Sequence, residues 1–179
     1  MSVPLPLLYP PGARAQEPVP PPTTETWWDV FNAQRDTDMP PQLRSWTCSI
    51  CATDWVLRAT GLNPWSAREQ VAGQIGYPHC VNENVGLVDT TCLLPVFEQY
   101  GVDAMQEWVD WDRCFDICSE TTGVLNGLGW YHFVAIRGLT DWGGLWIANS
   151  AESYRGVYST LSEEQFNALG PFQVVRLAR

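Results

Sequence analysis

Two histidines are the only imidazoles in the 179-residue chain, so a reaction that needs an imidazole must use His79 or His132. His79 follows the loop-forming sequence Gly-Tyr-Pro, whereas His132 lies near the start of the run WYHFVAIRGL, which is typical of a β-strand. A strand is a rigid platform, as a general base requires. We therefore take His132 as the candidate base.

Asn149 is the candidate partner of that histidine. The runs 130–139 and 145–149 are rich in β-branched and aromatic residues, and the segment TDWGG between them predicts a β-hairpin. If Gly138 pairs with Gly143, His132 lies directly opposite Asn149, with Cβ atoms about 4.5 to 5.5 Å apart. The Asn149 amide oxygen can then accept a hydrogen bond from one ring nitrogen and leave the other facing a nucleophile.

Cys48 is the candidate nucleophile. It begins an apolar helix predicted over residues 49–60 and ended by Gly61. An ordinary cysteine has a pKa of about 8.5, and unpaired amide groups at a helix N-terminus favour its thiolate. Cys51 lies one turn further along the helix, where we expect this effect to be weaker.

The charge balance excludes several partners. The chain has no lysine, ten arginines and a formal net charge of −10. Binding to nucleic acid or to an anionic membrane depends on clustered positive charge, so we expect neither. No stretch of about eighteen apolar residues is present, so we expect no membrane insertion. The N-terminal run is broken by prolines and has no charged start, so we do not expect a signal peptide.

The chain divides into three predicted parts. Eight of its fourteen prolines lie in the first 22 residues, which predicts an extended Pro-rich arm over residues 1–26. A short docking helix and linker follow over residues 27–41, closed by Pro40 and Pro41. Residues 42–179 are long enough for one domain with its own core. We interpret the arm as a tether to a protein partner, with a removable pro-segment that covers the cleft as the alternative.

The order of elements predicts an α+β fold. Helices are expected over residues 49–60, over 89–100 with an interruption at Pro95, and over 111–118. The hairpin follows, then a helix capped by Ser162 with Gln165 and ended by Gly170-Pro171, and then the strand FQVVRL. Helices followed by antiparallel strands indicate N-terminal helices packed on an antiparallel β-sheet.

Several segments of the sequence resemble those of a known protein family. The spacing of Gln42 and Cys48, with five residues between them, resembles that of the oxyanion-hole glutamine and the nucleophile in the papain-like cysteine peptidase superfamily. The segment from Cys48 to Gly61 looks like the opening helix of the bacteriocin-leader (double-glycine) peptidase-like branch. Further similar segments follow in order as residues 86–102, HFVAIRG at 132–138, Asn149-Ser150 and residues 161–166. The resemblance covers about residues 42–177.

This resemblance implies a papain-like fold and a cysteine peptidase or amidase that hydrolyses a bond of a peptide or protein substrate. Cys48 would attack the carbonyl, His132 would transfer the proton and Asn149 would orient His132. Gln42 and the Cys48 main-chain amide would bind the oxyanion. No cofactor is implied.

Three departures from the family pattern support an alternative. Ser49 replaces the usual glycine after the nucleophile, Tyr131 replaces the glycine often found before the histidine, and Ala151 replaces a tryptophan. A catalytically inactive papain-like module that binds or packs within a larger assembly is therefore a second hypothesis.

The cysteines allow two further alternatives. The Cys48-x-x-Cys51 pair could be redox-active, but no strand is predicted before it, as a thioredoxin-like motif requires. Combinations of that pair with His79-Cys80 and Cys114-x-x-x-Cys118 could supply four zinc ligands to a zinc-stapled domain. Otherwise we expect Cys80, Cys92, Cys114 and Cys118 to be buried or to form one or two disulfides.

Overall fold

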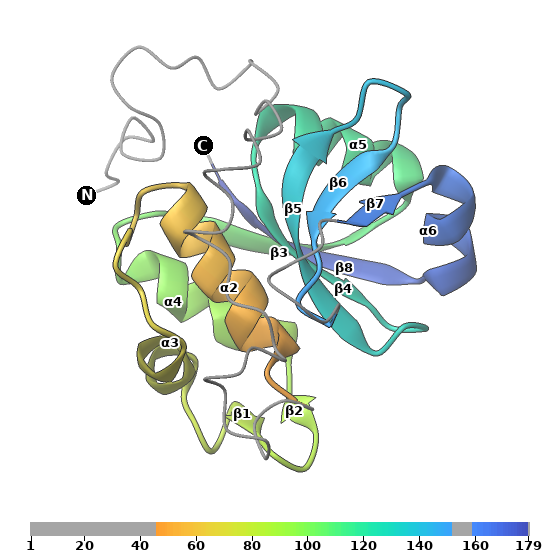
Figure 1. The fold of residues 1–179 in the computed structure, drawn as a ribbon. Coiled ribbons are helices and arrows are strands. Elements are labelled where there is room, and N and C mark those ends of the chain that lie inside the picture. Colours follow the sequence, from red (N-terminus) through yellow and green to blue (C-terminus); the bar gives the residue numbers. More distant parts are fainter. Residues whose placement is uncertain (1–45, 152–158, 179) are drawn as a thin grey trace.

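The computed structural model describes residues 46–151 and 159–178 (Figure 1). The predicted arm, the docking helix and Gln42 lie outside these residues. The helices are α2 (Cys48–Ala59), α3 (Arg68–Ile75), the 3-10 helix η3 (Thr90–Leu93), α4 (Leu94–Glu98), α5 (Trp111–Glu120) and α6 (Glu163–Leu169). The strands are β1 (Val81–Asn82), β2 (Gly86–Leu87), β3 (Ala104–Val109), β4 (Gly123–Gly127), β5 (His132–Leu139), β6 (Leu145–Ala148), β7 (Ser159–Leu161) and β8 (Phe172–Leu177).

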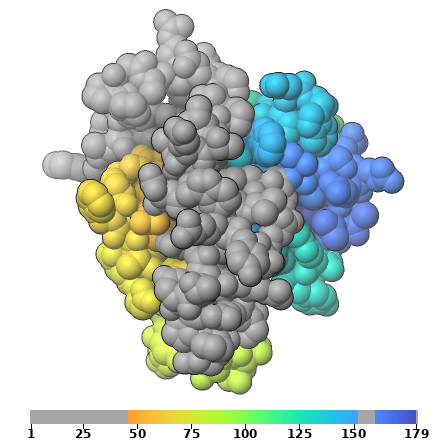
Figure 2. Space-filling view, viewed as in Figure 1, coloured from red at the N-terminus to blue at the C-terminus, as the bar shows by residue number. Residues whose placement is uncertain are grey.

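An antiparallel sheet of six strands organises the described residues. Its strand order is β3-β8-β4-β5-β6-β7, so the last strand of the chain lies between the first and second strands of the sheet. Helices α2, α3 and α4 gather at one side of this sheet, and α5 and α6 lie at the other (Figure 1). In the space-filling view the orange and yellow surface of α2 and α3 lies opposite the blue surface of the C-terminal strands (Figure 2). This arrangement confirms the predicted mixture of helices and antiparallel sheet.

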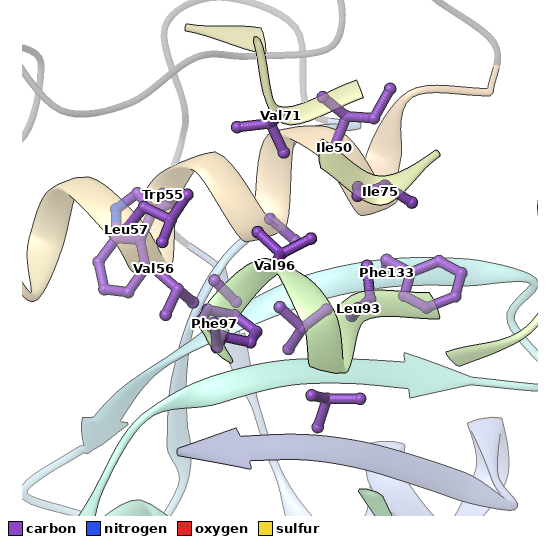
Figure 3. Close-up of a cluster of buried hydrophobic side chains, with 14 of the residues drawn as sticks. Ile50, Trp55, Val56, Leu57, Val71, Ile75, Leu93, Val96, Phe97 and Phe133 are labelled. Carbon is purple, nitrogen blue, oxygen red and sulfur yellow. The ribbon is translucent and has the colours of Figure 1, made fainter. Parts of the chain in front are cut away.

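One core lies between α2 and the sheet. Apolar side chains of α2, α3 and α4, among them Val56, Val71 and Phe97, meet Phe133 of β5 (Figure 3). Val56, Val71 and Phe97 are fully buried. Burying such a side chain stabilises a fold by roughly 1.5 to 3 kcal/mol. The α2 helix is therefore held against β5 by the apolar core.

A second core lies on the other face of the sheet. Val134 and Ile136 of β5 point there, because side chains alternate along a strand, and they pack with Phe166 of α6 and Phe172 of β8. The rings of Phe166 and Phe172 stack with centroids 4.1 Å apart. Both faces of β5 are therefore buried, which explains its nearly continuous apolar sequence.

The α2 helix matches its prediction within one residue at each end. Gly61 has a φ of +72°, the left-handed conformation that commonly follows the last helical turn. Arg58 in the last turn complements the negative end of the helix dipole. Every residue from Ser49 to Leu57 is buried.

The predicted helix over residues 89–100 is instead two shorter helices. Asp89 caps η3, because its side chain accepts a hydrogen bond from the Thr91 main-chain N–H at 2.7 Å. Pro95 lies in the first turn of α4, where a missing N–H costs nothing. The proline therefore marks the start of a new helix and does not interrupt a longer one.

The hairpin of β5 and β6 forms, but its predicted register is wrong. Ile136 pairs with Ile147 and Ala135 with Ala148, so the strands are shifted by two residues from the predicted pairing of Ile136 with Leu145. Two hydrogen bonds join Thr140 to Gly144: the Thr140 N–H donates to the Gly144 carbonyl at 2.8 Å, and the Gly144 N–H donates to the Thr140 hydroxyl at 2.7 Å. These bonds and a bulge between Ile136 and Gly138 set the observed register.

Strand β4 and helix α3 were not predicted. The sequence of β4, GVLNG, is short and begins and ends with glycine, although all five residues are buried. A Cβ at Gly123 would collide with the main-chain carbonyl of Val175 on β8, so this glycine is required for close approach of two strands. The need for it arises from a strand about fifty residues later in the chain.

Replacing Phe97 tests the core beneath α2. We expect Phe97→Ala to lower the free energy of unfolding by about 3 to 5 kcal/mol, because it leaves a cavity at a fully buried site. Urea unfolding followed by tryptophan fluorescence measures this change. The control Trp65→Ala removes a side chain that is 88% exposed, and its effect should stay within about 0.5 kcal/mol. Equal effects of the two variants would contradict the described core.

Candidate active site

The His132 and Asn149 side chains meet at one end of the hairpin. His132 begins β5 and Asn149 follows β6 directly. The ring Nε2 lies 2.8 Å from the Asn149 Oδ1 atom. Because an amide oxygen only accepts, Nε2 carries the proton and Nδ1 keeps its lone pair. The predicted contact therefore exists despite the register shift, because a shift of two residues keeps the same side chains on one face.

The amide of Asn149 is itself fixed. Its Oδ1 atom also accepts a hydrogen bond from the Ala151 main-chain N–H at 3.0 Å. Both side chains are nearly buried, with exposed fractions of 7% for His132 and 5% for Asn149. Burial lowers the pKa of His132, because the charged imidazolium loses solvent, and the hydrogen bond to Asn149 offsets part of this effect. The ring is therefore a neutral base at neutral pH.

Cys48 is the first residue of α2, as predicted. Main-chain N–H groups of Phe133, Ser49 and Cys48 itself interact with its sulfur and favour the thiolate. Burial has the larger effect, so the pKa of Cys48 is raised above its ordinary value. The predicted lowering of this pKa is therefore wrong for the present structure. The amide groups at the start of the helix favour a lower pKa for Cys48, as expected, but the loss of hydration raises this pKa by more.

The side chain of Cys51 is less exposed to solvent than that of Cys48. Its side chain is 2% exposed, whereas Cys48 is partly exposed. Burial raises the pKa of the Cys51 thiol far above its ordinary value. Neither cysteine is in a disulfide. Cys48 is therefore the thiol of this pair that a reagent or substrate can reach.

The thiol approaches β5 next to the histidine. The sulfur of Cys48 contacts the main chain of Phe133, the residue that follows His132. Among the described residues no hydrogen bond joins this sulfur to the His132 ring directly. The structure thus brings a neutral thiol to the strand position beside a neutral, oriented imidazole. Such a pair can form a thiolate and an imidazolium by one proton transfer when a substrate is bound.

A pocket of about 310 Å³ lies between the start of α2 and α3. Thr47 and Ile50 line it, and Trp46 and Tyr77 stack in its wall with ring centroids 5.9 Å apart. No residue that lines this pocket was predicted to be functional. The only signal in the sequence is the tryptophan two residues before Cys48.

The remaining cysteines do not form the predicted alternative zinc site. Cys80 and Cys92 are joined in a disulfide, which links the start of β1 to η3. Cys114 and Cys118 are buried free thiols on α5. Within residues 46–151 and 159–178, no group of three or more His, Cys, Asp or Glu side chains could hold a metal ion. No helix in these ranges has the length and apolar character needed to cross a membrane.

Comparisons with known proteins place the fold. No protein-family model matches the chain, and no curated protein matches it. A solved structure of a double glycine motif protease from the AMS/PCAT transporter, in complex with the leader peptide, is similar with a TM-score of 0.58. The two chains share 16% sequence identity over 83% of this chain and 91% of that protease chain. The chain therefore has a fold similar to that of this protease, in agreement with the fold that the sequence resemblance implies.

Alkylation tests the difference between the two cysteines of α2. We expect iodoacetamide to modify Cys48 before Cys51, because Cys48 is partly exposed and Cys51 is buried. The thiolate is the reactive form, so the native Cys48 rate at pH 7 should fall below that of the denatured chain and rise as the pH exceeds about 9. Peptide mapping at several pH values measures both rates. Equal rates at the two cysteines would contradict this description.

Proposed function

We propose that the protein is a thiol-dependent hydrolase that cleaves a peptide or amide bond, with Cys48, His132 and Asn149 as its catalytic triad. The observation that carries the proposal is the 2.8 Å hydrogen bond from the His132 Nε2–H to Asn149 beside a helix N-terminus that presents an accessible thiol. The fold supports it, because a double glycine motif protease shares this fold.

The proposed reaction starts from a neutral pair. His132 Nδ1 accepts the Cys48 proton while the sulfur attacks the substrate carbonyl carbon. The Asn149 amide oxygen stabilises the imidazolium that forms, because it already accepts from the opposite ring nitrogen. The imidazolium then protonates the leaving amine, and water hydrolyses the thioester with His132 as the base.

The oxyanion needs donors close to the attacking sulfur. The Cys48 main-chain N–H already interacts with the Cys48 sulfur and is the first proposed donor to the oxyanion. The side-chain amide of Gln42 is the second proposed donor, six residues earlier in the chain and outside the described residues. No cofactor enters the proposed reaction.

The proposed substrate is a peptide or a protein segment. The similar protease was solved with a leader peptide, and this supports an extended peptide as the substrate class here. We further propose that residues 42–179 form the hydrolase domain and that residues 27–41 are a docking helix and linker. The Pro-rich residues 1–26 would be a tether to a protein partner.

Peptide cleavage by the full chain tests the proposal. We expect Cys48→Ala to abolish cleavage of a fluorogenic peptide library, and Asn149→Ala to lower kcat/KM by about 10²- to 10⁴-fold through loss of the oriented base. Cys51→Ala is the matched control, one helical turn away, and should keep most of the activity. Cleavage that survives Cys48→Ala would contradict the proposal.

The pH profile of the same cleavage follows from the pKa of His132. The base must be neutral, and burial lowers its pKa below the ordinary value of about 6.5. The acid limb of kcat/KM should therefore lie below pH 6.5, with activity falling as the pH drops through the folded pKa. An acid limb above pH 7 would contradict a neutral His132.

A non-catalytic peptide-binding module is a second candidate function. It is favoured by the contact of the Cys48 sulfur with the Phe133 main chain and by the raised pKa of this thiol. This candidate predicts peptide binding of equal affinity by the wild-type chain and Cys48→Ala, with no turnover by either. Turnover that depends on Cys48 would exclude it.

A further inference from the structure

The turn between β4 and β5 brings a tryptophan against the candidate base. The Trp130 and His132 rings pack edge to face, with centroids 5.0 Å apart and an interplanar angle of 64°. Trp130 is partly buried, and its main-chain N–H donates to the Gly127 carbonyl at 3.1 Å, which closes the turn. The sequence alone predicted no role for Trp130.

The backbone of this turn has an unusual conformation between the two rings. Tyr131 has a φ of +53°, a left-handed conformation that is disfavoured for a bulky residue. Its side chain is 91% exposed, so packing of the Tyr131 side chain does not explain the conformation. The two rings in contact belong to the residues on either side of Tyr131. The strained backbone therefore accompanies the Trp130–His132 contact.

A glycine on the neighbouring strand provides space for the same contact. Gly127 pairs with His132 across β4 and β5. A Cβ at Gly127 would lie 2.7 Å from the Phe172 ring and 3.2 Å from the Trp130 Cβ atom. Trp130 thus fills the space between the second core, which contains Phe172, and the imidazole.

We propose that Trp130 is a positioning residue for His132, which covers the imidazole, excludes water from its hydrogen bond with Asn149 and limits rotation of the ring. Asn149 holds one ring nitrogen, and Trp130 packs against the ring itself. An aromatic ring provides this cover without a competing hydrogen-bond acceptor beside Nε2. Among the described residues, no charged side chain shifts the pKa of His132, so its surroundings act through burial and Asn149.

NMR of the full chain tests the proposal without any substrate. In Trp130→Ala we expect the His132 pKa to rise toward its ordinary value and the Nε2–H to exchange with water about tenfold faster, because water reaches the hydrogen bond. Trp130→Phe keeps an aromatic ring and should give an intermediate result. The control Trp142→Ala removes a tryptophan that is 59% exposed in the β5–β6 turn, and it should match the wild type.

A purely structural role predicts a different outcome. Trp130 also packs against the second core, so Trp130→Ala could lower stability without changing the imidazole. Unchanged Nε2–H exchange and an unchanged His132 pKa in a folded Trp130→Ala protein would overturn the proposal. If Trp130→Ala does not fold, wild-type exchange in Trp130→Phe would overturn it.

The kinetic part rests on the proposed function. For the cleavage reaction we expect Trp130→Phe to lower kcat with little change in KM, and to move the acid limb of kcat/KM upward. A shift of the His132 pKa in a protein without turnover would support Trp130 as a positioning residue while contradicting the hydrolase. Turnover with no effect of Trp130→Phe on kcat, the pH profile or exchange would contradict the positioning role alone.

Discussion

The burial of α2 against β5 is the constraint on which the rest of the site depends. Nine consecutive residues of this helix, Ser49 to Leu57, are buried, so nearly every side of it contacts protein. A helix packed in this way can neither rotate nor slide without opening a cavity. Cys48, the residue before this run, is therefore held at the start of β5. The same strand carries His132, so this packing interface sets how far Cys48 lies from His132.

This packing also determines the charge state of the site. Burial raises the pKa of Cys48 and lowers that of His132, which favours the neutral form of both groups. The helix N-terminus and the hydrogen bond to Asn149 oppose these shifts without reversing them. A neutral pair avoids a buried charge in the resting protein and leaves the proton transfer to the reaction itself. This charge state agrees with the proposed reaction, in which His132 acts as a general base toward the Cys48 thiol.

Sequence reasoning predicted those features that depend on local patterns. The α2 helix and its end at Gly61 follow from apolar residues and one glycine, and the capping box of Ser162 and Gln165 is present as predicted. The hairpin was predictable, but its register depends on hydrogen bonds of Thr140 and on a bulge that no local pattern indicates. The pKa of Cys48 was predicted in the wrong direction, because burial depends on distant segments that pack around the thiol.

Features set by distant residues could not be predicted in this way. Strand β4 is defined by its neighbours β5 and β8, and its glycines are needed because of the Val175 main chain and the Phe172 ring. Even the contact between the nearby residues Trp130 and His132 accompanies a left-handed backbone at Tyr131, which the residue type does not predict. Trapping an acyl-enzyme is the most direct test of Cys48 as the nucleophile. The protein is mixed with a peptide p-nitrophenyl ester, quenched with acid and analysed by mass spectrometry. We expect an acyl group on Cys48 that is absent in His132→Ala, and an acyl group on Cys51, or none at all, would contradict the proposed hydrolase.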